Sequence, residues 1–166
     1  MPGHNRGKVK ARYFYLIALL VVILDQASKH LVLSRVLFGS SIPVLRNVLF
    51  ITLVENRGGA FGLFQSWAGL LTLLTIGFVI VIAALVRRRA IRRGGLVGIG
   101  LGLQLGGAVG NLIDRVRFGY VVDFINFRVW PVFNIADAAI TAGLLLLAYY
   151  LFFCEGRRSD PQQTEG

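Results

Sequence analysis

Four long apolar stretches limit the folds that this chain can adopt. They cover residues 13–33, 67–86, 94–113 and 132–154. A bilayer core is about 30 Å thick, and a helix needs about 20 apolar residues to cross it, because lipid offers no partner for an unpaired backbone N–H or C=O. The pattern therefore predicts an all-α polytopic membrane protein with four transmembrane helices.

The composition agrees with a membrane protein. Of 166 residues, 55% are hydrophobic and 16% are charged, and the mean hydropathy is +0.68, which is too apolar for a small soluble domain. The first stretch begins like a cleavable signal peptide, but no small-x-small cleavage site follows it. We therefore expect it to be retained in a single domain over residues 1–155, followed by a polar tail at 156–166.

The basic residues indicate how the chain crosses the membrane. Four Lys and Arg residues precede Tyr13, five lie in the link 87–93 (RRRAIRR), and two follow residue 154, which leaves seven of the 18 elsewhere. By the positive-inside rule, both termini and this link are cytoplasmic, and the segments 34–66 and 114–131 lie outside. The basic residues behind the net charge of +10 lie in short clusters between apolar runs. They therefore indicate how the chain crosses the membrane, and we predict no nucleic-acid partner.

A glycine repeat runs along the third stretch. Its members are four residues apart, at Gly94, Gly98, Gly102, Gly106 and Gly110. Small residues at this spacing let membrane helices approach closely. The run GIGLGLQLGG does not complete the dinucleotide fingerprint G-x-G-x-x-G and has no strand before it, so we predict helix packing and no nucleotide cofactor.

The outer segments are not featureless. The run VLFITLV (48–54) is rich in β-branched and aromatic residues and predicts a short strand or hairpin on the membrane surface. The run 118–131 has a similar composition, which suits the membrane interface.

Four aspartates are predicted at or near the outer face: Asp25, Asp114, Asp123 and Asp137. Asp137 lies five residues into the fourth stretch, about 7–8 Å deep at 1.5 Å per residue. Asp123 lies in the short outer loop among apolar neighbours. The chain between them can turn back, so their carboxyl groups can meet, and such a pair can share one proton and act as general base and general acid.

Two asparagines lie one helical turn from these acids. Asn111 precedes Asp114 by three residues and Arg115 by four, and Asn134 precedes Asp137 by three. Residues at this spacing are neighbours on a helix. Both asparagines are therefore candidates for a polar shell that supports the acids.

The remaining two aspartates have cationic residues close to them in sequence. Asp25 and Lys29 have i, i+4 spacing, which favours a local ion pair at the outer end of the first span. Asp114 is followed by Arg115 and Arg117, which favour an ion pair that closes the end of the third span. We expect structural roles for both acids.

Further chemistries have less support. The sequence lacks G-x-S-x-G, its single cysteine, Cys154, lies at the cytoplasmic end, and His30 fits an interfacial polar residue better than a catalytic base. A magnesium site built from aspartates stays open, and with it metal-dependent phosphotransfer on lipids. Two non-hydrolytic functions also stay open: a proton-coupled transporter or channel, and a scaffold packed through the glycine repeat.

Five short motifs occur in order along the chain: DQASK (25–29), NRGGAFGLF (56–64), GGAVGNLIDR (106–115), VVDF (121–124) and FNIADAAI (133–140). Together they resemble the motifs of the bacterial lipoprotein signal peptidases, or signal peptidase II. The resemblance implies an aspartyl endopeptidase of the cytoplasmic membrane. Such an enzyme removes the signal peptide of a diacylglyceryl-modified prolipoprotein by cleaving just before the lipidated cysteine.

The resemblance also assigns roles to residues. It makes Asp123 and Asp137 the catalytic pair. Residues that line or support the site would be Asn56, Gly58, Asn111, Arg115 and Asn134, and structural ones would be Asp25, Gly110 and Asp114. The implied fold has four helices and a small extracytoplasmic β-layer, without a metal or other cofactor. The implied partners are a lipid-modified prolipoprotein and membrane lipids, and we expect a monomer. Gly59 departs from the family pattern, where alanine is more frequent, which loosens this loop slightly.

Overall fold

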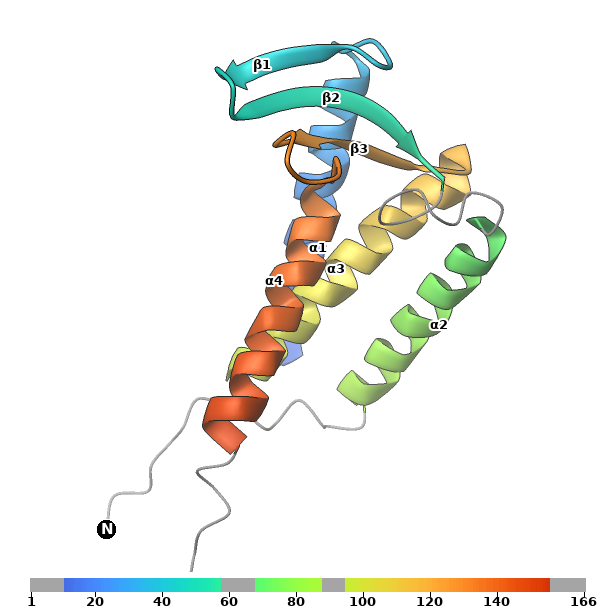
Figure 1. Ribbon diagram of the computed structural model, residues 1–166. Coiled ribbons are helices and arrows are strands. Elements are labelled where there is room, and N and C mark those ends of the chain that lie inside the picture. Colours follow the sequence, from blue (N-terminus) through green and yellow to red (C-terminus); the bar gives the residue numbers. More distant parts are fainter. Residues whose placement is uncertain (1–10, 58–67, 88–94, 156–166) are drawn as a thin grey trace, which may run out of the picture.

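A bundle of helices carries a small sheet at one end (Figure 1). The computed structural model describes residues 11–57, 68–87 and 95–155. Its helices are α1 (Ala11–Leu33), α2 (Ala68–Arg87), α3 (Gly95–Phe118) and α4 (Ile135–Tyr149), and α4 continues into the π-helical turn η4 (Tyr150–Glu155).

Four of the described helical segments are long and apolar enough to cross a membrane: Tyr13–Leu33, Gly69–Val86, Gly95–Phe118 and Ile135–Cys154. Their outward faces carry large apolar side chains; on α1, for example, Leu20, Ile23 and Leu24 are each more than half exposed. Lipid can cover such faces at no cost, whereas water cannot. The predicted fold class is confirmed.

Two span boundaries differ from the prediction. α3 continues to Phe118 instead of ending at Ile113, so Asp114 and Arg115 lie in the helix. α4 begins at Ile135 instead of residue 132 because Asn134 caps it. Asp137 is therefore the third residue of α4, nearer the helix end than predicted.

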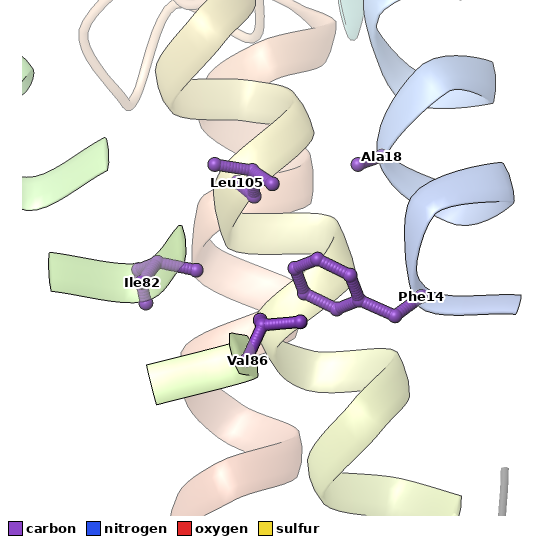
Figure 2. Packing of buried hydrophobic residues seen from close by; sticks show 5 residues of the cluster. All are labelled: Phe14, Ala18, Ile82, Val86 and Leu105. Atoms are coloured by element: carbon purple, nitrogen blue, oxygen red, sulfur yellow. The ribbon is translucent and has the colours of Figure 1, made fainter. Parts of the chain in front are cut away.

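The helices pack around α3. Figure 1 places α1 and α4 beside α3, while α2 lies along α3 at the outside of the bundle. Figure 2 shows the apolar cluster that joins three of them, with Phe14 and Ala18 from α1, Ile82 and Val86 from α2, and Leu105 from α3.

The predicted close approach at the glycine repeat is present. A Cβ at Gly106 would lie 2.6 Å from the backbone oxygen of Ala18 in α1. A contact of this kind leaves no room for a side chain, so α1 and α3 meet backbone to backbone at this level.

The sheet is antiparallel in the order β1–β2–β3, with β1 at Ser41–Leu45, β2 at Leu49–Asn56 and β3 at Val121–Asn126. β2 confirms the predicted strand at 48–54, and β1 makes it a hairpin. β3 was not predicted: Asp123 lies in a strand and not in a loop. Apolar residues of the sheet and the end of α1 form a second cluster, with Val32, Leu53, Val122 and Phe124 at its centre.

Candidate active site

Asp123 is held from two sides by amide groups. It lies opposite Val54 in the β2–β3 pairing, while Asn56 lies opposite Val121, so Asn56 and Asp123 are diagonal neighbours on one face of the sheet. Nδ2 of Asn56 donates to Oδ2 of Asp123 at 2.7 Å, and Nδ2 of Asn134 donates to Oδ1 at 2.6 Å. The carboxyl group is almost completely buried, so these donors replace water.

A tight return of the chain brings Asn134 beside β3. Arg128 adopts a positive φ of 65°, and Phe133 then bridges to Ile125, with Phe133 N–H donating to the Ile125 oxygen at 3.1 Å. The next residue, Asn134, is fully buried next to Asp123. The predicted turning-back of the chain between Asp123 and Asp137 thus occurs through this bridge.

Asn134 and Asp137 form a capping box at the start of α4. Oδ1 of Asn134 accepts from the Asp137 backbone N–H at 2.9 Å, and the carboxylate of Asp137 accepts from the Asn134 backbone N–H at 3.3 Å. The first N–H groups of a helix lack intrahelical partners, which makes this position favourable for a carboxylate. Asn134 therefore contacts both Asp123 and Asp137.

Asn111 of α3 supplies the second amide to Asp137. Its Nδ2 donates to Oδ1 of Asp137 at 2.8 Å, and its Oδ1 accepts from Asn134 at 3.1 Å and from Lys29 at 3.1 Å. The sequence places Asn111 near Asp114 and Arg115, whereas the fold points its amide at Asp137.

A buried ionic network lies behind these groups. Nζ of Lys29 is 2.8 Å from Oδ2 of Asp25, as the i, i+4 spacing predicts, and 2.7 Å from Oδ2 of Asp114. The expected pairing of Asp114 with Arg115 or Arg117 is wrong: within the described part of the chain, its ion-pair partner is Lys29 of α1. A buried cation between two buried carboxylates offsets part of the cost of removing them from water.

The same acids also hold backbone groups of other elements. Oδ1 of Asp25 accepts from the Ala136 N–H of α4 at 3.0 Å, and Oδ2 of Asp114 accepts from the Val122 N–H of β3 at 3.0 Å. Gln26 donates to both Asp25 and Asp114. The network therefore ties α1, α3, α4 and β3 together just behind Asp123 and Asp137.

Gly110 makes room for this network. A Cβ at this position would lie 2.6 Å from Oδ2 of Asp25. Arg115 is partly buried, and its charge acts on Asp137, Asp114 and Asp123. Gly58, the remaining candidate, lies outside the described residues.

Sequence reasoning missed the contribution of Lys29. Its i, i+4 spacing points only to Asp25 as a partner, whereas in the fold it contacts three polar groups. A lysine among the apolar residues of a membrane span is a signal that could have identified it, because such a charge requires buried partners. His30, its neighbour, is exposed, as expected for an interfacial residue.

The environment of Asp123 favours its protonated form. Burial, with a smaller contribution from the nearby charge of Asp137, raises the pKa of Asp123 to about 7, although hydrogen bonds from Asn56 and Asn134 oppose the rise. One carboxyl of the pair can therefore hold a proton at neutral pH. Within residues 11–57, 68–87 and 95–155, no three His, Cys, Asp or Glu side chains are arranged to hold a metal ion.

Two carboxyl groups that share amide donors, one of them with a pKa near neutrality, can activate water and protonate a leaving group. The family model described as Signal peptidase (SPase) II matches residues 17–153. This chain belongs to the signal peptidase II family. The resemblance drawn from the five motifs is confirmed, and the transporter, the scaffold and lipid phosphotransfer lose their support as functions.

Curated relatives of this signal peptidase II match it over most of its length. The lipoprotein signal peptidase of Halothermothrix orenii is 44% identical over 83% of this chain and 94% of its own length. Those of Geobacillus thermodenitrificans and Geobacillus kaustophilus are 47% and 48% identical, over 89% and 84% of this chain and 94% and 93% of their own lengths.

Solved structures share the fold of this signal peptidase II. A bacterial membrane enzyme determined by the in meso method at 2.3 Å has a TM-score of 0.86 and 30% identity, covering 98% of this chain and all of that one. A second, at 1.9 Å, has a TM-score of 0.80 and 32% identity, covering 91% of this chain and 99% of that one.

Proposed function

We propose that Asp123 and Asp137 are the catalytic carboxyl groups of this signal peptidase II. The family makes the protein a membrane aspartyl endopeptidase that removes signal peptides from prolipoproteins. The observation that carries our assignment is the position of Asn134, whose side chain binds Asp123 and whose backbone N–H binds Asp137. One residue thereby keeps the buried carboxyl group of Asp123 and the half-buried one of Asp137 together at the start of α4.

In the proposed mechanism, water is the nucleophile. One carboxylate takes a proton from the water while the other carboxyl, protonated, donates a hydrogen bond to the scissile carbonyl oxygen. That hydrogen bond stabilises the oxyanion of the tetrahedral intermediate. The first carboxyl group, which now carries the proton taken from water, gives it to the leaving amine as the C–N bond breaks, so the reaction requires no covalent intermediate and no metal.

We further propose that the substrate is a diacylglyceryl-modified prolipoprotein, cleaved just before its lipidated cysteine. A lipidated substrate reaches the site from the bilayer, with its acyl chains between helices. The apolar outer faces of α1 and α2 support this route, and so does the position of Asp123 in β3 and of Asp137 at the start of α4. The bilayer would then align the lipid anchor of the substrate with the acids.

The topology that we propose places both termini in the cytoplasm and the aspartates near the extracytoplasmic face. The basic residues before Tyr13, in 87–93 and after residue 154 support it. We also propose that residues 1–155 form one domain that acts as a monomer in contact with membrane lipids, with 156–166 as a cytoplasmic tail.

The supporting residues divide into two groups in this proposal. Those that position the acids or line the substrate site are Asn56, Gly58, Asn111, Arg115 and Asn134. Those that hold the helices together behind the site are Asp25, Gly110 and Asp114. The hydrogen bonds of the three asparagines and the ion pairs of the two aspartates support this division.

The test uses purified full-length protein and a precursor peptide that carries a diacylglyceryl cysteine. We expect cleavage before this cysteine, unchanged by a metal chelator, and none with Asp123→Asn or Asp137→Asn. The same peptide without the lipid should be cleaved far more slowly. Near-normal cleavage by either variant would refute the assignment of the pair, and loss of activity with chelator would indicate a metal-dependent reaction.

A further inference from the structure

Lys29 contacts the polar support of the site directly. Its ammonium group is within hydrogen-bond distance of three acceptors: Oδ2 of Asp25 at 2.8 Å, Oδ2 of Asp114 at 2.7 Å and Oδ1 of Asn111 at 3.1 Å. An ammonium group has three N–H donors and no acceptor. Each of its donors therefore has one partner, and the side chain is almost completely buried.

This contact determines which way the Asn111 amide faces. Because Lys29 can only donate, the atom of Asn111 that faces it must be the oxygen. The NH2 group then faces the opposite way, toward Oδ1 of Asp137, to which it donates at 2.8 Å. With the amide turned over, an oxygen would face the carboxylate of Asp137 and an NH2 group would face the ammonium, and both contacts would be repulsive.

Asn134 supports the same orientation less firmly. Its NH2 group has two hydrogens but faces three acceptors: Oδ1 of Asp123 at 2.6 Å, Oδ1 of Asn111 at 3.1 Å and the oxygen of Val122 at 3.3 Å. Its shortest contact is to Asp123. Lys29, which has one N–H for each of its three acceptors, is therefore the firmer donor to the oxygen of Asn111.

We infer that Lys29 is a positioning residue for peptide hydrolysis, which acts through the Asn111 amide to fix the carboxyl group of Asp137. The inference rests on the proposed catalytic role of Asp137. The positive charge of Lys29 adds a second effect. It favours the ionised form of Asp123 and so opposes the rise in the pKa of Asp123 that burial causes. A misplaced catalytic group can cost about 100-fold in rate, so the effect of Lys29 should appear in kcat.

The first experiment compares Lys29→Met with Gln26→Met in the full-length enzyme. Gln26 donates to Asp25, to Asp114 and to the Gly110 oxygen, so its loss weakens the same network without touching Asn111. We expect Lys29→Met to lower kcat about 100-fold while KM changes less than about threefold. Gln26→Met should lower the melting temperature but keep kcat at temperatures where the enzyme is folded.

The second experiment tests whether Lys29 acts through Asn111. If it does, the double variant Lys29→Met/Asn111→Ala should lose no more kcat than the worse single variant, since residues that act as a unit are not additive. If Lys29 only stabilises the fold, the loss of kcat in the double variant should be the product of the losses in the two single variants. The kcat of each variant should then follow the fraction of the enzyme that is folded. Multiplied losses, or a kcat of Lys29→Met equal to that of Gln26→Met, would overturn the inference.

Lys29→Met leaves two buried carboxylates without a cation, so it can fail to accumulate in the membrane. In that case the double variant Lys29→Met/Asp114→Asn is used in place of Lys29→Met. Its control is the single variant Asp114→Asn, in which the ammonium group of Lys29 still donates to Asn111. The same 100-fold difference in kcat, about the cost of a misplaced catalytic group, is expected between these two. Activity that survives Asp137→Asn would refute the catalytic pair, whereas loss in Asp137→Asn with normal kcat in Lys29→Met would refute only the role of Lys29.

Discussion

Asn134 and Asp137 cap one another at the start of α4, with the Asn134 oxygen 2.9 Å from the Asp137 N–H and the Asp137 carboxylate 3.3 Å from the Asn134 N–H. A carboxyl group that we assign to catalysis is thus also part of a helix cap. The Asn134 N–H holds one oxygen of this carboxyl group and the Asn111 amide holds the other, so the substrate does not have to organise it.

This double role separates two substitutions of Asp137. Asp137→Asn keeps one oxygen that can accept from the Asn134 N–H but turns an NH2 group toward the NH2 group of Asn111, so it should remove cleavage and lower the melting temperature in detergent less than Asp137→Ala does. Asp137→Ala should remove cleavage and also lower stability by about 1 kcal/mol, a typical loss for a helix cap. Cleavage assays and thermal unfolding measure both effects, and equal stability of the two variants would contradict the capping role.

The pKa of Asp123 predicts the pH dependence of cleavage. A pair that works with one shared proton loses activity when that proton leaves, so kcat/KM should fall as the pH rises past about 7. Asn56→Ala removes a donor that stabilises the carboxylate of Asp123. The pKa of Asp123 should then rise further, and the alkaline limb of the profile should move to higher pH.

A matched control exists on the neighbouring strand. Nδ2 of Asn126 donates to Oγ1 of Thr52 at 3.0 Å, between β3 and β2 and away from the aspartates. Asn126→Ala should leave the alkaline limb where it is in the wild-type enzyme. A limb that stays in place for Asn56→Ala, or moves to lower pH, would contradict the proposed protonation state.

Gly110 should be intolerant of even one methyl group. In Gly110→Ala the new Cβ would lie 2.6 Å from Oδ2 of Asp25. Lys29 holds this oxygen, and the Ala136 N–H holds Oδ1 of the same carboxylate. Overpacking of this kind costs about 1–3 kcal/mol, so the melting temperature should fall. Gly77→Ala in α2 is the control, since nothing beyond the adjoining backbone of α2 lies within 4 Å of its new Cβ, and it should not destabilise the protein.

The proposed topology predicts which side of the membrane two new cysteines would face. In a Cys154→Ser background, Val44→Cys lies on β1, where the residue is 55% exposed, and should react with an impermeant maleimide added to intact spheroplasts. Ser159→Cys lies in the proposed cytoplasmic tail and should react only after permeabilisation. The reverse pattern would invert the topology.

The sequence was most informative where its signals are local. The apolar stretches predicted four helices, and β-branched residues predicted β2, because each depends on neighbours in the chain. β3 was missed because Asp123 and its apolar neighbours show no alternating pattern, and the strand forms only by pairing with β2. The end of α3 was misplaced because Asp114 looks like a boundary until its partner Lys29 is known.

The approximate spans, the number of acids near one face and, through five ordered motifs, the family all follow from the sequence alone. Which acids pair with a cation, and which are held only by amide donors, depends on how the helices pack. Lys29 meets Asn111 across 82 residues, and Asp25 holds the N–H of Ala136 across 111. A buried charge pairs with the group that packing places beside it. The packing of α1 against α3 and α4 cannot be predicted from the sequence positions of Lys29 and Asp25.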